Sequence, residues 1–212
     1  MFLVLEGIDG AGKGRQRIEL TEYLKTLKDI QVESMEFPDH QGCLYKEYIK
    51  PYLLEKIKLS PESLFISFAL DQLLLQDKIK LAKGSKKSFF LCDGYFTTNI
   101  VYNCLVKNSI DFKEAINFAK AFKINEADYN IYIDVLPEIA LKRKSKEEGH
   151  NEGLDINERD LEKQHKIRES FHYLAKNNIF GKWIIVDGNG TIDEVKENII
   201  KKLIEFKIIK KL

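Results

Sequence analysis

A chain of 212 residues that carries 34 lysines and arginines against 33 aspartates and glutamates has a formal net charge of +1, so its charge balance does not favour bulk nucleic-acid binding. Its apolar share of 44% is ordinary for one globular domain, and its apolar runs are too short for a transmembrane helix or a signal peptide. Its three cysteines have no metal-ligand spacing and cannot all pair within the chain, so we expect a reduced cytoplasmic protein without membrane contact.

The N-terminal segment holds the most informative motif of the chain. An apolar run at residues 2–5 leads directly into a glycine-rich loop with the pattern G-x-x-x-x-G-K. A buried strand, such a loop and a following helix bind phosphates, because loop N–H groups and the helix dipole attract the anion while the lysine reaches the outer phosphates. The candidate nucleotide-binding residues of this loop are Gly7, Gly10, Ala11, Gly12, Lys13 and Gly14.

Two residues of the loop differ from a plain phosphate-binding loop. Gly14 stands where such loops carry a Ser or Thr hydroxyl for magnesium. Asp9 places a carboxylate beside the expected phosphates, where it is unfavourable unless it serves the acceptor or the metal, so we interpret it as functional. The alternative for the whole motif is a glycine-rich turn with an exposed lysine. The strand before the loop and the amphipathic stretch after it favour phosphate binding.

Strand-like and helical segments then alternate along the chain. Further strands are predicted at residues 31–37, 88–93, 129–134 and 182–187. A long helix is predicted from Ser60 to Gly84, because Ser60 is a good N-cap and Pro61 fits the first helical position. Thr191 and Glu194 form a capping box that begins a C-terminal helix. Apolar strands separated by helices predict an α/β domain, with a parallel sheet covered on both faces, over residues 1–212.

The stretch from Lys142 to Arg159 is highly charged and contains two glycines, Gly149 and Gly153. One interpretation is a solvated helix end followed by a loop. The other is a mobile active-site lid over about residues 143–158.

Three predicted strands end in an aspartate: Asp93, Asp134 and Asp187. Ligands of open parallel sheets bind beyond the carboxyl ends of the strands, so these carboxylates lie at the expected binding edge. Asp93 is the candidate for holding magnesium through water. Its alternative role is the N-cap of a helix that begins near Thr97.

Taken together, these residues resemble the thymidylate kinases, a family of nucleoside monophosphate kinases. The segments that carry the resemblance are residues 2–13, 91–95 with Asn99 and Tyr102, 130–143, and 160–171. They cover nearly the whole chain and keep the order that they have in the family. The resemblance implies a P-loop three-layer sandwich with a five-stranded parallel sheet in the order 2-3-1-4-5. It also implies a homodimer.

The function that the resemblance implies is transfer of the ATP γ-phosphoryl group to dTMP or a related nucleoside monophosphate, with Mg²⁺. By position, Lys13 and the loop amides would hold the ATP phosphates, and Arg143 would lie near the adenine or the lid. Asp9 would face the acceptor sugar, and Phe68 would stack on the acceptor base unless it is a core residue of its helix. The expected lining of the acceptor pocket is completed by Phe37, Gln72, Tyr95, Asn99 and Tyr102. The candidates for catalysis are Lys13, Asp9, Asp93 and Arg15.

The chain departs from the family pattern at its phosphate-binding positions. Gly14 replaces the family's Ser or Thr, while Gly94, Gln72 and His40 stand where arginines are expected. The lid segment also has no arginine between Lys146 and Arg159. Each arginine lost from a phosphate site removes a charge-assisted interaction worth roughly 1.5–3 kcal/mol.

Compensation for these losses could come from Arg15, Arg17 or Lys46, although both arginines are equally suited to a solvated helix surface. Two further functions therefore stay open at this point. One is a nucleotide-binding paralogue with weak or no kinase activity. The other is a kinase for a different acceptor, for example one without a phosphate. Turnover assays across acceptors would separate the three.

Overall fold

The computed structural model of the chain describes residues 1–145 and 160–210. Five parallel strands form one sheet in the order β2-β3-β1-β4-β5. The strands are β1 (Phe2–Glu6), β2 (Gln31–Glu36), β3 (Ser88–Asp93), β4 (Ala127–Asp134) and β5 (Gly181–Asp187). This order and the parallel pairing confirm the predicted α/β P-loop topology, in which the first strand is central.

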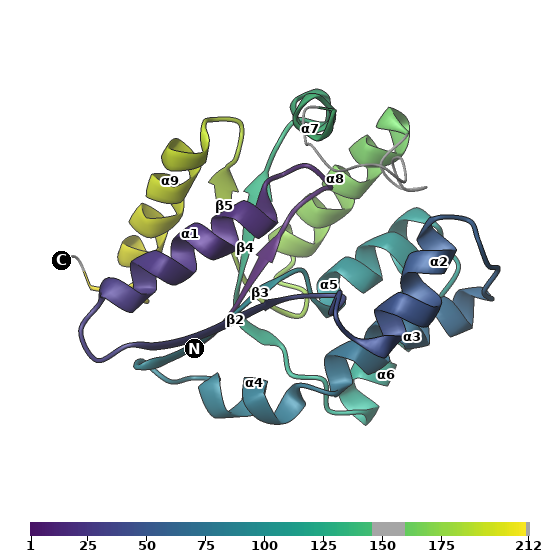
Figure 1. Ribbon diagram of the computed structural model, residues 1–212, viewed down its shortest axis with the longest axis horizontal. Helices are drawn as coiled ribbons and strands as arrows, with labels where there is room; N and C mark the ends of the chain where they lie inside the picture. Colours follow the sequence, from purple (N-terminus) through teal and green to yellow (C-terminus); the bar gives the residue numbers. More distant parts are fainter. Residues whose placement is uncertain (146–159, 211–212) are drawn as a thin grey trace.

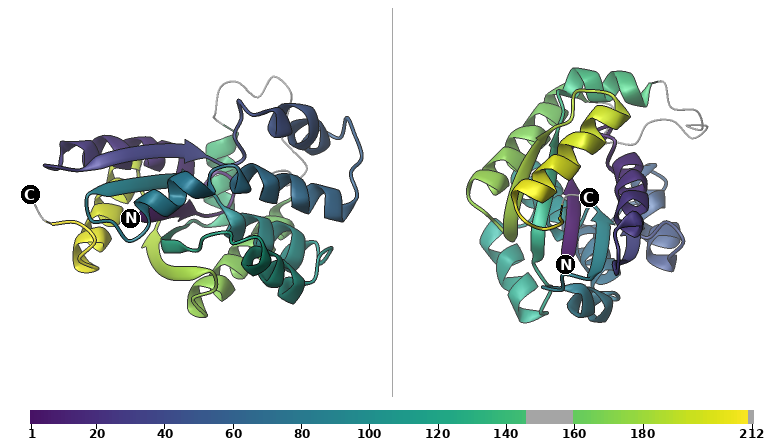
Figure 2. Two further views of the ribbon diagram at one scale, coloured as in Figure 1. Left: turned by 90° about the horizontal axis from the view of Figure 1, so that it is seen from below. Right: turned by 90° about the vertical axis from the view of Figure 1, so that its left-hand side faces the viewer.

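Helices cover both faces of the sheet, which gives three layers (Figures 1 and 2). The helical segments are α1 (Lys13–Thr26), η1 (Tyr45–Ile49), α2 (Lys50–Leu53), α3 (Pro61–Leu73), α4 (Gln76–Ala82), α5 (Phe96–Asn99), η2 (Ile100–Val106), α6 (Phe112–Ala121), α7 (Pro137–Lys144), α8 (Leu161–Lys176) and α9 (Ile192–Glu205). Helices α1 and α9 pack against each other and against the strands, while α4 and α8 contact the opposite side. No helix among the residues described is long and apolar enough to cross a membrane.

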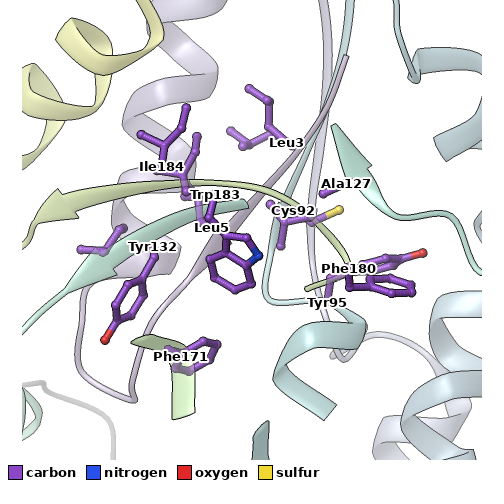
Figure 3. Packing of buried hydrophobic residues seen from close by; sticks show 14 of the residues in the cluster. Leu3, Leu5, Cys92, Tyr95, Ala127, Tyr132, Phe171, Phe180, Trp183 and Ile184 are labelled. Carbon is purple, nitrogen blue, oxygen red and sulfur yellow. The ribbon is translucent and has the colours of Figure 1, made fainter. Parts of the chain in front are cut away.

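The strands form where the sequence is almost continuously apolar, and their burial explains this composition. All five residues of β1 are buried because neighbouring strands flank it and helices cover both of its faces. Aromatic side chains fill the layer beneath the sheet. There, Trp183 of β5 lies among Leu5, Tyr132 and Phe171 (Figure 3). The ring centroids of Tyr132 and Phe171 are 5.4 Å apart.

Strand register brings the ends of the central strands to one edge of the sheet. Leu5 pairs with Asp93, and Glu6 pairs with Tyr132. The loop after β1 therefore starts beside the carboxylate at the end of β3. This shared edge positions the site.

The long helix predicted from Ser60 to Gly84 is wrong, because the chain forms two helices that break after Leu73. Leu75 leaves helical geometry, with φ −114° and ψ 8°. At the break, the side chain of Gln76 donates to the Gln72 carbonyl at 2.8 Å and to the Tyr95 hydroxyl at 2.8 Å. These contacts hold the second helix at a new angle. The apolar pattern continues through the break because both helices bury one face.

Candidate active site at the carboxyl ends of the strands

A cavity of about 740 Å³ opens at the carboxyl ends of β1 and β3. Its walls come from the loop after β1, the start of α1, the segment after β2, helix α3 and segment η2. The predicted site residues that line it are Asp9, Gly10, Gly12, Lys13, Gly14, Arg15, Phe37, Phe68, Gln72, Asp93, Tyr95, Asn99 and Tyr102. The fold therefore places the predicted phosphate loop and the predicted acceptor residues around one space.

The phosphate loop ends at the N-terminus of α1. Gln16 N–H makes an early helical bond to the Gly12 carbonyl at 2.9 Å, so the N–H groups of the residues just before it have no partner within the helix. Lys13 Nζ donates to the carbonyls of Gly7 and Ile8 at 3.0 and 3.1 Å. The ammonium group thus lies over the loop, where an anion bound to the helix N-terminus would meet it.

Helix α7 packs directly on this loop at Gly10. Gly10 has a φ of +80°, and a Cβ there would lie 2.5 Å from the Ala140 carbonyl oxygen and 3.1 Å from Lys144 Cγ. The backbone conformation and the close approach both require glycine. Gly7 and Ala11 complete the loop, although neither is among the described residues that line the cavity.

Gly14 faces the carboxylate at the end of β3. A Cβ on Gly14 would lie 3.3 Å from Asp93 Oδ2, so a hydroxyl at this position would be next to Asp93. Burial raises the pKa of Asp93, and the charges of Lys13 and Arg17 oppose this rise. Asp93 is not the cap of the next helix, because α5 begins at Phe96 with Tyr95 at its N-cap position.

The part of the cavity predicted to hold the acceptor contains a hydrogen-bonded pair from distant parts of the chain. The Tyr102 hydroxyl donates to Asp9 Oδ2 at 2.6 Å. Phe68 is half-buried in the cavity wall and is not part of the hydrophobic core cluster, which contains Phe65 instead. Phe37 packs near Tyr95, with ring centroids 5.6 Å apart.

Tyr95 and Asn99 are more deeply buried than expected of side chains that contact a ligand. Tyr95 is 1% exposed, and its hydroxyl accepts the hydrogen bond from Gln76. Asn99 donates to the Phe65 carbonyl at 3.0 Å, and its Oδ1 accepts from Asn103 at 2.7 Å. Both residues border the cavity but hold η2, α3 and the core together.

Two buried amide oxygens of cavity-lining residues have no hydrogen-bond partner among the described residues. They are Gln72 Oε1 and Asn103 Oδ1, and both side chains are 2% exposed. A buried acceptor without a hydrogen bond costs roughly 1–3 kcal/mol, so the burial of these two amide oxygens is unfavourable. Gln72 was predicted from its position, whereas no motif singled out Asn103.

The arginines make contacts that limit their reach. Arg143 donates to the carbonyls of Gly188 and Gly190 at 2.9 and 2.7 Å, which ties α7 to the loop between β5 and α9. It is not among the described residues that line the cavity. Arg15 lines the cavity and forms an ion pair with Glu19 at 2.7 Å.

The other suggested compensating residues lie elsewhere. Arg17 points toward β2, where it donates to Ser34 Oγ at 3.4 Å. Lys46 Nζ donates to Gln41 Oε1 at 3.4 Å. Neither residue lines the described part of the cavity. Of the three candidates, Arg15 alone lines the described part of the cavity.

Sequence reasoning missed three lysines of the cavity wall: Lys50, Lys107 and Lys144. Lys13 and Arg15 also line the cavity, which makes five basic side chains. The lining has three carboxylates, those of Asp9, Glu36 and Asp93. The described lining therefore has an excess of positive charge, as an anion-binding site requires. Lys50 and Lys107 belong to segments without a motif. The one feature of the sequence that pointed to Lys144 is its position directly after Arg143, a predicted site residue.

Glu6 is a second feature that sequence reasoning missed. It is the last residue of β1 and is fully buried, with hydrogen bonds from the hydroxyls of Thr97 and Thr98, the latter at 2.7 Å. Burial raises the pKa of Glu6 to about 7, although these hydrogen bonds and Lys13 oppose the rise. A neutral carboxyl group therefore lies directly beneath the phosphate loop in mildly acidic solution.

The lid predicted over residues 143–158 lies mostly outside the described residues. Residues 143 and 144 end α7, and the structure describes the chain again from residue 160. The alternatives for this stretch therefore stay open.

Comparison with known proteins gives a consistent result. The family model described as thymidylate kinase matches residues 5–199. A probable thymidylate kinase of Methanococcus aeolicus is 32% identical over 214 residues, which cover 98% of each chain. The thymidylate kinase of Plasmodium falciparum is 26% identical over 98% of this chain and 91% of its own. That of Mesomycoplasma hyopneumoniae is 28% identical over 94% of each chain.

Proposed function

Because the chain belongs to the thymidylate kinase family, we propose that its 740 Å³ cavity binds ATP and dTMP side by side and transfers the γ-phosphoryl group between them. The observation that carries the proposal is the shared cavity. The phosphate loop with Lys13 forms one part of its wall, and the Asp9–Tyr102 pair forms the neighbouring part. The chain is accordingly a nucleoside monophosphate kinase.

The chemistry requires positioning and charge neutralisation more than covalent catalysis. An oxygen of the acceptor phosphate attacks the γ-phosphorus of ATP, and the bond from that phosphorus to the β–γ bridging oxygen breaks. ADP and dTDP leave with no net gain or loss of a proton. In this scheme, Lys13 and the loop amides hold the donor phosphates. Asp9, fixed by Tyr102, accepts a hydrogen bond from the acceptor sugar.

The residues present fit a magnesium ion held mainly by the nucleotide. Asp93 is the carboxylate at the end of β3 and lies beside the start of α1, where it can hold the ion through water. Among the described residues, no three His, Cys, Asp or Glu side chains form a group that could hold a metal ion. When bound, Mg²⁺ would neutralise charge on the β- and γ-phosphate oxygens.

The test of the function is ADP production from Mg-ATP with dTMP, dUMP, thymidine or no acceptor. We expect turnover with dTMP well above the control without acceptor. Turnover with thymidine and none with dTMP would overturn the proposal in favour of an acceptor without a phosphate. ATP binding with no turnover on any acceptor would indicate a nucleotide-binding paralogue.

Gly14→Ser is expected to raise magnesium-dependent kcat by about tenfold, an energy of roughly 1.4 kcal/mol. The new hydroxyl would lie beside Asp93, because the Cβ position is 3.3 Å from its Oδ2. Serine also removes the entropic cost of glycine in a helix. The measurement is kcat across a magnesium titration, with Gly14→Ala as the control that adds the Cβ alone. Equal kcat values for the serine and alanine variants would exclude a simple metal-ligand defect.

We further propose that the chain forms a homodimer through α3. Three large apolar residues follow one another at helical spacing along α3 and its C-cap. They are 49%, 41% and 69% exposed: Ile66 and Leu70 on the helix, and Leu74 directly after it. Such a continuous apolar stripe is typical of a surface that a second copy covers. Figure 1 shows α3 away from α1 and α9.

Leu74→Glu is therefore expected to convert a dimer to a monomer, because each subunit of a two-fold interface would bring an uncompensated charge into it. Light scattering after size-exclusion chromatography gives the mass directly. Ile18→Glu is the matched control, since Ile18 is 49% exposed but lies on α1. A wild-type mass of 24.7 kDa, that of one chain, would refute the dimer.

A further inference from the structure

We propose that this chain binds single-stranded nucleic acid at the edge of the sheet opposite the cavity, in addition to its kinase function. The binding surface is a basic face, made of the segments that lead from a helix into the next strand together with the end of α9. The formal net charge of +1 did not indicate this partner, because a sum over the chain hides how the charges are distributed.

The parallel sheet brings the segments of the basic face to one edge. Gln31 and Ser88, the first residues of β2 and β3, pair with each other, and so do Ala127 and Gly181, the first residues of β4 and β5. The segments before these strands therefore share an edge that is about 19 Å wide for five strands. Helices α1 and α9 also end on the side where β1 begins (Figure 1). The basic face consists of residues 25–30, 83–87, 120–126, 176–182 and 201–210.

Lysines dominate the basic face. They are Lys25, Lys28, Lys83, Lys86, Lys87, Lys120, Lys123, Lys176, Lys182, Lys201, Lys202, Lys207 and Lys210. Against these thirteen lysines stand three carboxylates, those of Asp29, Glu126 and Glu205. The lysines whose ammonium groups have a contact partner among the described residues are Lys25, Lys83, Lys182 and Lys202. The basic face therefore carries a concentrated positive charge, which attracts a polyanion.

Lysines near the ends of helices also have a simple structural role, because they interact favourably with the helix dipole. This role explains four of the thirteen, which lie in the last turns of α1, α6, α8 and α9: Lys25, Lys120, Lys176 and Lys202. The other nine lie outside these turns. Lys86 and Lys87, for example, follow the last residue of α4 by four and five positions. The helix dipole therefore does not explain the accumulation of charge.

Phe122 gives the basic face an open aromatic ring between Lys120 and Lys123. It is 56% exposed, although its ring stacks on that of Phe118, with centroids 4.4 Å apart and planes 30° apart. Because one face of the ring is covered, the other face is the one open to solvent, where a nucleic-acid base can stack. A ring that lies against the protein in this way is poorly suited to insertion into a lipid bilayer.

A second aromatic group lies at the end of α9. Phe206 is 46% exposed and meets Tyr129 edge to face, with ring centroids 6.0 Å apart. Lys182 Nζ lies 5.5 Å from the centre of the Tyr129 ring. Exposed aromatic rings among lysines are typical of surfaces that bind single strands, because the rings stack on bases while the ammonium groups follow the phosphates.

The five segments of the basic face contain no arginine. Sequence readout commonly uses the planar, two-pronged contacts of arginine with a base edge, whereas lysine acts on a phosphate as a point charge. The basic face therefore fits the phosphate backbone and the unpaired bases of a strand of any sequence. RNA and DNA share this chemistry.

The experiment measures the fluorescence anisotropy of a labelled single-stranded RNA of about 20 nucleotides, and of the same sequence as DNA, with the full chain. We expect a Kd of about 1–10 μM at about 50 mM KCl, and a steep loss of affinity toward about 200 mM KCl. Saturating Mg-ATP and dTMP should not displace the strand, because the cavity lies at the opposite edge of the sheet.

The test variant is the triple substitution Lys86→Gln, Lys120→Gln and Lys201→Gln, which removes exposed lysines from three segments of the basic face. We expect it to weaken RNA binding at least about tenfold. It should also make the slope of log K against log[KCl] shallower by about 2, since each phosphate contact to a single strand contributes about 0.7. Its kcat for dTMP phosphorylation should match the wild type.

The matched control is the triple substitution Lys58→Gln, Lys113→Gln and Lys142→Gln, which removes the same charge from exposed positions outside the basic face. Its affinity for RNA should stay within about twofold of the wild type, because it removes no phosphate contact. In a separate variant, Phe122→Leu should weaken binding at least about fivefold and leave the salt slope unchanged, since it removes stacking but no charge.

Four results would overturn the inference. Equal affinities of the two triple variants would place the bound strand elsewhere, and displacement by Mg-ATP would place it in the cavity. Binding to vesicles of phosphatidylserine and phosphatidylcholine, with no binding to either strand, would identify a lipid surface as the partner. No binding to the strands or the vesicles at about 50 mM KCl would show that the lysines serve the fold alone. Failure of the kinase assay would leave the inference intact, because nucleic-acid binding does not use the cavity.

Discussion

Lys13→Met is expected to lower kcat for dTMP phosphorylation by at least about a thousandfold, a loss of roughly 4 kcal/mol in transition-state stabilisation. Methionine keeps the length of the side chain but removes the charge that lies over the carbonyls of Gly7 and Ile8. The outer phosphates of ATP would then meet the loop amides without their cation. Steady-state kinetics, with ATP binding measured by calorimetry, gives the size of the loss.

The control for this prediction is Lys25→Met, at the other end of α1. Lys25 is exposed and pairs with Glu22 at 2.8 Å, so its loss should leave kcat unchanged. If Lys13→Met retained wild-type kcat and ATP affinity, the loop after β1 would not be the phosphate site.

Glu6→Gln is expected to remove a fall in stability of about 3 kcal/mol between pH 4.5 and 7. Burial raises the pKa of Glu6 from 4.5 to about 7, so the folded state keeps a proton that the unfolded state releases in this range. The stabilising contribution of this residue to the free energy of unfolding is therefore fully present below pH 4.5. That contribution is lost as the pH rises through 7. Glutamine stays neutral and shows no such loss.

The measurement is urea unfolding of the wild type and Glu6→Gln at pH 5 and pH 8. Because other groups also titrate, the informative quantity is the difference between the two proteins at each pH. It should favour the variant by about 2.5 kcal/mol more at pH 8 than at pH 5. Glu22→Gln, on an exposed position of α1, is the control. A constant difference across this range would mean that Glu6 is ionised in the folded protein at both pH values.

The fold was predictable where the signals are local. The run from Phe2 to Lys13 combines an apolar strand, glycines and a lysine within a few residues, so it could be interpreted without knowledge of the rest of the chain. The order of the strands came from the resemblance to a family, because parallel neighbours are far apart in sequence. Gln76 shows the limit. It begins the second helix, just after the break, and contacts Tyr95 and Asn125, which no local pattern contains.

The site was predictable at the level of segments more than of atoms. Periodicity alone could not separate Phe65, which packs in the core, from Phe68, which lines the cavity, because both are apolar positions of one helix. The burial of Glu6 depends on the strands and helices that surround it. Lys144 acquires its place from the packing of α7 on Gly10, a contact between residues far apart in the chain.

Three of the glycines that line the cavity differ in how far they can be redesigned. Gly14 accepts a side chain with a small adjustment, since its nearest neighbour is a carboxylate oxygen at 3.3 Å. Gly94 has room for a Cβ, 3.3 Å from Thr98 Oγ1, but its φ of +65° would cost an arginine there about 1–2 kcal/mol. Gly10 has no such freedom, because the backbone of α7 occupies the space. An engineer who grafts more phosphate-binding groups onto this scaffold should therefore begin at residue 14, compensate for strain at 94, and leave 10 untouched.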